Sequence, residues 1–241
     1  MKIAKIITVI MLIFGNAPIY SQSWETIKCE LQSGDTTFLI NERIILSYKD
    51  ETTGENQRYT ERRAVYIDSN KDSEYYDKIF DFRENDGYIE YLDEKKKSLP
   101  ENLPKKWIPL YQYNNEYYLY APCQWIISKY NITDTVILYY GWMEGIYGLR
   151  YDTIIQKSND WFTIQEVKRF HYNTEINIYI IDREKGIAVF EYNDKLYEPF
   201  LVVSAETARQ FPIIVYMCDS LEPEYEFSKP NFDELTAKFK K

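Results

Sequence analysis

The sequence predicts an all-β, mainly antiparallel fold: a meander-type barrel or sandwich of roughly ten to fourteen strands with a short C-terminal helix. Runs rich in tyrosine and branched residues recur about every ten residues. Pairs of Asn, Asp or Gly separate these runs, as in tight hairpin turns. Strand-like and helical patterns do not alternate along the chain, which disfavours a parallel sheet.

Residues 107–121 form the clearest unit, because two aromatic, branched runs flank Asn114-Asn115. The same pattern returns at residues 186–197 around Asn193-Asp194. Asn and Asp tolerate the positive φ that a two-residue hairpin turn requires. We therefore predict one kind of hairpin at both places.

Before residue 107 the composition predicts strands at residues 26–31, 37–48 and 59–67, with Asn41-Glu42 as a turn. Residues 68–74 form a polar loop. Residues 75–82 and 88–92 are expected to pair as a hairpin around Asp86-Gly87. Residues 93–106 contain two prolines and a lysine cluster, so they are predicted to form a connector and a possible boundary within the domain.

After residue 121 the strands follow one another with short turns, as in an antiparallel meander. The predicted strands are residues 124–130, 135–140, 148–156, 161–167, 175–181, 187–192, 195–203 and 213–217. The expected turns are Tyr130-Asn131, Glu144-Gly145, Ser158-Asn159-Asp160, Tyr172-Asn173 and Glu184-Lys185-Gly186. Ser204 is a good cap for a short helix over residues 205–210, and Asn231 for a terminal helix over residues 231–239.

The first 22 residues have the features of an export signal. Lys2 and Lys5 precede an apolar run over residues 6–14, which is too short to span a bilayer, and small polar residues follow it. We expect cleavage after Ser21 or Gln22 and a single β-rich domain over residues 23–241. The predicted location is periplasmic or extracellular, without stable membrane insertion.

The charge balance excludes some partners. The formal net charge is −9, and removal of the signal with its two lysines changes it to −11. Such a surface repels nucleic acid and anionic lipid. An acidic surface also suits a basic protein partner, although simple solvation is the more common role.

Cysteine and histidine usage gives no metal or cofactor signature. Cys29, Cys123 and Cys218 fit no zinc spacing, and His171 is the one histidine in the chain. An oxidising compartment permits one disulfide, whose pairing the sequence leaves open. The Asp68–Glu74 stretch resembles only the first positions of an EF-hand calcium loop, with Ser73 where glycine is needed. We predict no metal and no cofactor.

No catalytic set is recognisable. The chain has no GxSxG, HExxH, P-loop or GxGxxG motif. Acidic residues are abundant near two aromatic segments, Asp81, Glu84 and Glu90 in one and Asp160 and Glu166 in the other. A glycosidase needs two carboxylates held a few ångströms apart, which is a tertiary property. We assign no catalytic residue.

Aromatic content is the unusual feature, since 24 tyrosines, 12 phenylalanines and 5 tryptophans make 17% of the chain. Residues 139–148 combine such rings with three glycines. Amphipathic rings stack on sugars and pack at interfaces. We name Tyr140, Trp142, Tyr147 and Tyr151 as candidate ligand-binding residues, against the alternative that these tyrosines simply fill a sheet.

The sequence thus favours an exported, non-catalytic binding protein of unknown specificity. Its ligand would be a glycan, a small molecule or a protein that contacts an aromatic-rich surface. Two alternatives stay open: a carbohydrate-active hydrolase with a carboxylate pair, and an acidic inhibitor or partner of a basic protein.

Overall fold

The fold is taken from a computed structural model, which describes residues 23–28, 36–49, 56–82, 95–122, 127–142, 145–169, 172–194, 197–218 and 226–240. The predicted signal peptide and the Asp86-Gly87 turn lie outside these residues. So do Cys29, Cys123 and His171.

The larger of two sheets has nine strands, and every neighbouring pair in it is antiparallel. In spatial order its strands are β10 (Thr153–Ser158), β11 (Trp161–Arg169), β12 (Tyr172–Asp182), β13 (Ile187–Tyr192), β14 (Phe200–Ser204), β4 (Lys106–Pro109), β7 (Lys129–Ile132), β8 (Val136–Trp142) and β9 (Gly145–Arg150). The sheet curls, so that Lys168 of β11 also pairs with Arg150 of β9.

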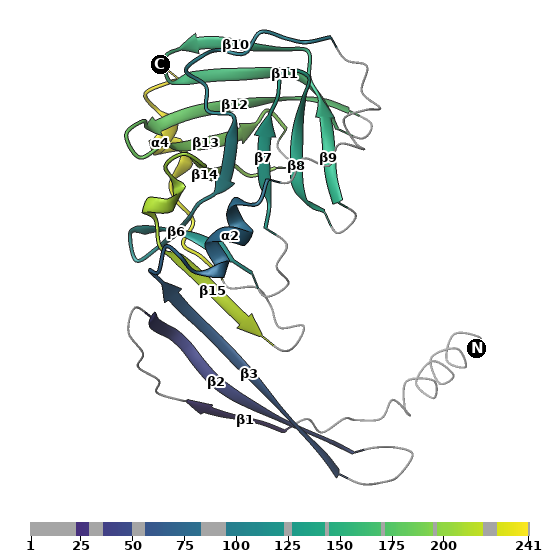
Figure 1. Ribbon diagram of the computed structural model, residues 1–241, viewed down its shortest axis with the longest axis vertical. Helices are drawn as coiled ribbons and strands as arrows, with labels where there is room; N and C mark the ends of the chain where they lie inside the picture. The colour runs from purple at the N-terminus through teal and green to yellow at the C-terminus, as the bar shows by residue number, and fades with distance from the viewer. Residues whose placement is uncertain are drawn as a thin grey trace, which may run out of the picture.

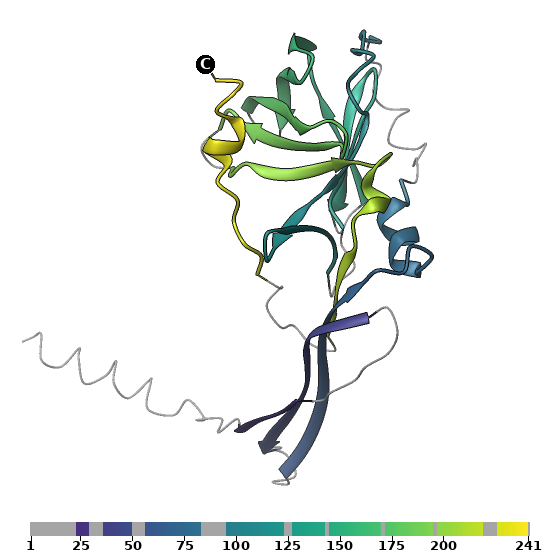
Figure 2. The same cartoon turned by 90° about the vertical axis from the view of Figure 1, so that its left-hand side faces the viewer.

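A six-stranded sheet forms the second layer. Its strands, in order, are β1 (Ser23–Lys28), β2 (Thr36–Lys49), β3 (Asn56–Asp68), β15 (Ile213–Cys218), β6 (Glu116–Ala121) and β5 (Tyr111–Tyr113). All pairs are antiparallel except β15 with β6. Figures 1 and 2 show β1, β2 and part of β3 extending away from the nine-stranded sheet.

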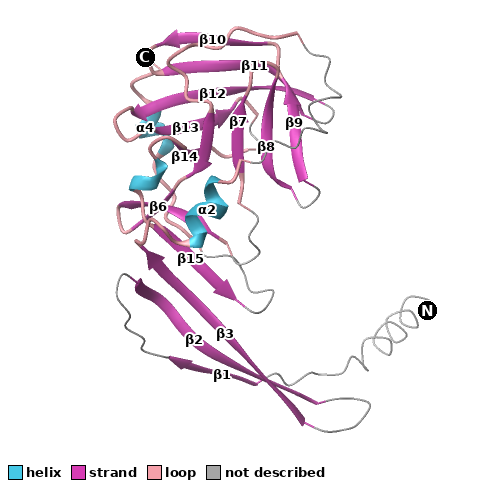
Figure 3. Cartoon of the chain, in the orientation of Figure 1, coloured by secondary structure: helices cyan, strands magenta, loops and turns pink. Residues whose placement is uncertain are grey.

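The predicted fold class is confirmed. Strands dominate the described residues, and helices are few and short (Figure 3). The described strands form no closed barrel, so the sandwich-like alternative fits. No helix in the described part of the chain is long and apolar enough to cross a membrane.

Two apolar cores lie on opposite faces of the nine-stranded sheet. One fills the curl of that sheet and includes Trp107, Phe162 and Phe190. The other lies between this sheet and the β15–β6 pair and includes Val189 and Leu119. β13 contributes alternate residues to both cores, and this explains why its sequence is an almost continuous apolar run.

The predicted hairpin at Asn114-Asn115 is confirmed. Their φ values of 49° and 64° are those of a tight turn of two left-handed residues, and Tyr113 pairs with Glu116 across it. Residues 107–113 are not one strand, however. β4 belongs to the nine-stranded sheet and β5 to the other sheet, and the chain crosses between them at Leu110.

The prediction of a matching tight hairpin at Asn193-Asp194 is wrong. β13 does pair with a following strand, but the partner begins at Phe200, opposite Phe190. The backbone N–H of Asn193 donates to Glu175 O at 2.9 Å, so the chain continues along β12 before it returns. A longer connection therefore replaces the turn.

The prediction of a strand at residues 75–82 is also wrong, because Glu74–Phe80 forms helix α2. Tyr76 and Ile79, three residues apart, are both fully buried on one helix face. Lys78 pairs with Glu74 one turn earlier at 3.0 Å. Burial against the 3₁₀ turn η1 (Ala208–Gln210) and β15 thus outweighs the high strand propensity of the aromatic residues.

Four further boundaries differ from those predicted. Asn41-Glu42 lies inside β2, paired with Ala64 and Arg63, and is no turn. Tyr130-Asn131 lies inside β7, paired with Tyr139 and Leu138, and is no turn either. Tyr172-Asn173 begins β12 and is likewise paired. The single strand predicted at residues 148–156 is divided into β9 and β10.

The C-terminal predictions hold in shortened form. The expected helix after Ser204 is a single 3₁₀ turn, η1 (Ala208–Gln210). The terminal helix is α4 (Phe232–Thr236), capped as predicted by Asn231, whose Oδ1 accepts from Glu234 N at 3.3 Å. Phe232 and Leu235 pack against the core between the sheets.

Candidate functional site

A pocket of about 310 Å³ lies where β4 leaves the nine-stranded sheet. Four stretches line it: residues 109–112, residues 128 and 130, residues 198–201, and residues 227–230 with 232. Small-molecule sites are typically concave, mostly apolar and lie between packed elements. The volume is at the lower end of the usual range and suits a ligand with one ring.

The early end of β4 explains why a pocket forms here. β4 lies between β14 and β7, with Val202 opposite Pro109 and Tyr130 opposite Trp107. Pro109 has no N–H with which to extend the pairing, and the chain crosses to the other sheet after Leu110, whose N–H still donates to Leu201 O at 3.0 Å. Phe200 begins β14, two residues before the partner of Pro109, and Ser128 immediately precedes β7; both line the pocket.

Two groups of aromatic rings contribute to the lining. In the first group the rings of Tyr130 and Phe200 stack with centroids 5.8 Å apart. In the second group Phe227 packs against Tyr111 at 4.6 Å and against Tyr120 at 4.9 Å. The pocket therefore offers ring faces and edges from both sheets, a surface that favours flat apolar groups.

The second ring group depends on a segment close to the C-terminus, residues 226–230, which we call the strap. Its backbone is tied to β5 through Ser228, whose N–H donates to Gln112 O at 3.0 Å. In Figure 2 the strap runs, in yellow, up to α4. The C-terminal helix thereby fixes one end of the pocket wall.

One ion pair lies among the residues that line the pocket. Lys229 Nζ donates to Glu198 Oε1 at 2.6 Å, and both side chains are largely exposed. Glu198 is the one carboxylate among the described lining residues. The described lining therefore shows no second carboxylate facing Glu198, of the kind that glycoside hydrolysis requires.

Tyr140 and Tyr151, two of the predicted ligand-binding residues, are buried. Tyr140 packs edge-on against Phe82, with centroids 5.5 Å apart. The Tyr151 hydroxyl donates to Thr133 O at 2.7 Å, and burial, with the nearby Asp134 charge, raises the pKa of Tyr151 to about 12. Both rings have a structural role in this state.

Tyr147 is partly buried opposite Tyr139 and packs with Tyr151 in the core inside the curled sheet. Tyr140 belongs to a separate cluster on the opposite face of β8. The structure therefore does not bring the predicted tyrosines to one surface. The backbone of Trp142 pairs with Gly145, and its side chain lies outside the described atoms. Ligand contact by these four residues stays a prediction.

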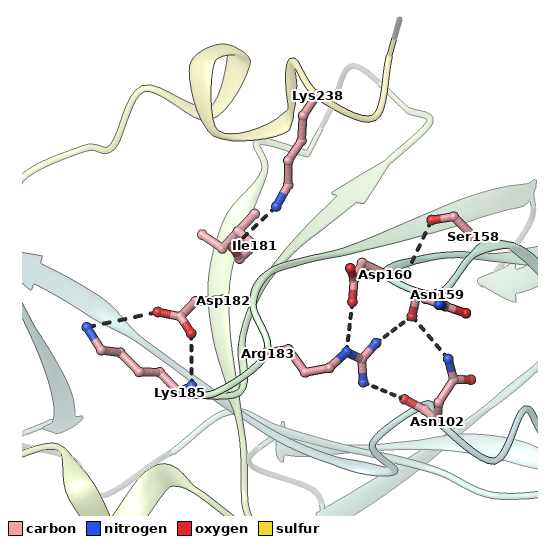
Figure 4. A network of polar contacts seen from close by, with 9 residues as sticks. All are labelled: Asn102, Ser158, Asn159, Asp160, Ile181, Asp182, Arg183, Lys185 and Lys238. Atoms are coloured by element: carbon pink, nitrogen blue, oxygen red, sulfur yellow. Dashed lines mark hydrogen bonds and ion pairs between the residues drawn. The ribbon is translucent and has the colours of Figure 1, made fainter.

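The acidic candidates near the aromatic segments have structural partners where they are described. Asp160 accepts from Arg183 Nε at 2.8 Å, and Arg183 also donates to Asn159 O and Asn102 O (Figure 4). This network fastens the β10–β11 turn to the connector before β4. Glu84, Glu90 and the side chain of Glu166 are not among the parts of the chain that the structure describes.

The calcium-like stretch is an ordinary turn. Asp68 Oδ1 accepts from Asn70 N at 2.8 Å, and Asn70 Oδ1 accepts from Asp72 N at 3.0 Å. These oxygens cap backbone N–H groups. Within the described ranges, no group of three or more His, Cys, Asp or Glu residues is placed to hold a metal ion.

No protein-family model matches this chain, and neither do the curated proteins or the solved structures compared with it. Function must therefore be inferred from the site itself. Sequence reasoning singled out the aromatic clusters but missed the pocket. One usable signal was that Pro109, Pro199 and Pro230 each lie within two residues of an aromatic residue, because all three prolines line the pocket.

Proposed function

We propose that this protein is an exported, non-catalytic binding protein that takes a small, ring-containing ligand into the pocket between its two sheets. The aromatic lining of that pocket carries the proposal. Rings from β5, β7, β14 and the strap surround a volume that suits one ring of a ligand. Export rests on the N-terminal sequence pattern alone.

The pocket is partly formed before any ligand arrives. Tyr130 is buried and holds Phe200 in a stacked pair, while Phe227 is held between Tyr111 and Tyr120. Rings that are already ordered lose little conformational freedom on binding. Affinity then comes from the apolar area that the ligand removes from water.

Calorimetric titration of the protein with indole, phenol and methyl β-glucoside tests the proposal. We expect saturable binding of indole and phenol. Phe227→Leu and Phe200→Leu should each weaken it by about two- to tenfold, the value of one aromatic contact. Tyr113→Leu is the matched control, because Tyr113 packs in the same aromatic cluster as Phe227 but does not line the pocket; it should change the affinity less than twofold.

Two results would contradict the proposal. One is the absence of saturable binding by either ring compound. The other is equal weakening by Tyr113→Leu and the two pocket variants, because that would show a general loss of structure. Binding of the glucoside alone would instead favour the glycan ligand expected for the loop around Trp142.

A further inference from the structure

The mouth of the pocket carries a matched pair of opposite charges. Lys229 and Glu198 are the two charged side chains among the described lining residues, and they lie in direct contact at 2.6 Å. The relative exposure of the side chains is 62% and 75%, so both can reach a ligand without burial of charge. Apolar walls on one side and one charge of each sign at the rim restrict which ligands fit well.

On this basis we infer that the ligand is an aromatic α-amino acid bound as its zwitterion, an inference that rests on the proposed function. Its ring occupies the space between Phe227 and Phe200. Its carboxylate pairs with Lys229 and its ammonium pairs with Glu198.

Charge balance favours a zwitterion over a singly charged ligand. A ligand with only a carboxylate pairs with Lys229 but leaves Glu198 without its cation, so one ion pair replaces another. A ligand with only an ammonium group pairs with Glu198 and likewise leaves Lys229 without its anion. A zwitterion replaces the Lys229–Glu198 ion pair by two ion pairs, one between its carboxylate and Lys229 and one between its ammonium group and Glu198. In an α-amino acid both charges are on the same carbon, which matches two protein charges that touch each other.

The size of the pocket agrees with this ligand class. About 310 Å³ accommodates a single ring system and little more. The opening beside the strap leaves the charged end of the ligand in water. Exposed ion pairs are weak, so each should change the affinity by up to about fivefold. Most of the affinity should therefore come from the ring.

Four ligands that share a phenyl ring separate these contributions: L-phenylalanine with both charges, 3-phenylpropionate with the carboxylate, 2-phenylethylamine with the ammonium group, and 3-phenylpropanol with neither. Calorimetry at low ionic strength measures each affinity with the full mature chain. We expect phenylalanine to bind several-fold more tightly than the other three.

Two charge-removing variants assign each contact. Lys229→Gln should weaken the binding of phenylalanine and 3-phenylpropionate and leave the affinity for 2-phenylethylamine no lower. Glu198→Gln should weaken the binding of phenylalanine and 2-phenylethylamine and leave the affinity for 3-phenylpropionate no lower. Both side chains are exposed, so neither change threatens folding.

The outcomes distinguish this inference from the proposed function. If 3-phenylpropanol binds and phenylalanine binds no more tightly, the zwitterion inference is wrong and the ring pocket remains. If phenylalanine binds best but neither charge variant affects it, the inference is also wrong. If none of the four ligands binds, both the inference and the proposed function fail.

Discussion

The Lys229 ammonium lies 2.6 Å from the Glu198 carboxylate and joins the strap to the loop before β14. The two residues are 31 positions apart in the chain. Together with the Ser228–Gln112 hydrogen bond, this contact holds the strap beside the pocket. These two polar contacts and the packing of Phe227 against Tyr111 and Tyr120 fasten the strap.

We expect this ion pair to contribute little to stability, because both side chains are exposed. A double-mutant cycle of Lys229→Gln and Glu198→Gln should give a coupling of about 0.2–1 kcal/mol at low salt. The coupling should shrink at high salt, where surface charges are screened. Urea denaturation measures it, and a coupling above about 2 kcal/mol would mean that the pair is a structural latch.

Gly186→Ala should destabilise the fold by about 1–3 kcal/mol. Gly186 has φ +67°, and a Cβ there would lie 2.3 Å from Thr207 Oγ1 and 3.1 Å from Ser204 Cβ. Thermal or urea unfolding measures the loss. Glu184→Ala in the same turn is the control and should stay within about 0.5 kcal/mol, because Glu184 is exposed. A neutral Gly186→Ala would contradict the geometry of this turn.

Lys129→Met should destabilise the protein by about 1–3 kcal/mol. The Lys129 side chain is buried, and its Nζ donates to Asp81 O at 2.5 Å and Lys78 O at 3.3 Å at the end of α2. Removal leaves these carbonyls without a charged donor at the negative end of the helix. Lys78→Met is the matched control. Its exposed pair with Glu74 is worth about 0.3–0.5 kcal/mol, so equal losses for the two variants would contradict this role.

Stability should fall as the pH rises from 10 to 12, and Tyr151 should contribute to that fall. Burial raises the pKa of Tyr151 to about 12, above its ordinary value of 10.0, so the folded state keeps a proton that the unfolded state releases. The stabilisation is complete below pH 10 and is lost as the pH rises through the folded pKa. Tyr151→Phe removes the titrating group.

Urea unfolding between pH 8 and 12 measures this effect. The stability of Tyr151→Phe should decline less steeply than that of the unmodified protein over that interval, although the variant lacks the hydrogen bond to Thr133 O. Parallel declines for the two proteins would show that Tyr151 ionises as easily in the folded state as in water.

The sequence predicted the elements whose structure is decided locally. The Asn114-Asn115 turn is determined by residues that adopt positive φ, and β13 by a run of apolar residues buried on both faces. Asn231 was a recognisable cap for α4. Each of these signals lies within a few residues of the element that it predicts.

The errors concern features that depend on distant contacts. Tyr76 and Ile79 form a helix face because both are buried in a core built by residues far along the chain, where Tyr76 Oη also donates to Phe211 O at 2.6 Å. Asn193-Asp194 resembles a tight turn, yet the N–H of Asn193 bonds back to Glu175. The pocket depends on β4 leaving its sheet at Pro109 and on a strap that arrives from the C-terminus. No window of neighbouring residues contains these relationships.

The central claim is that a ring enters the space between the two sheets, and methyl NMR of the protein titrated with L-phenylalanine tests it most directly. Leu110 and Leu201 line the pocket, whereas Ile164 and Ile178 are buried in the core inside the curled sheet. We predict saturable shifts of the Leu110 and Leu201 methyl signals, with the two isoleucines unchanged. Unchanged leucine signals at about 10 mM ligand, well above a millimolar dissociation constant, would contradict the claim.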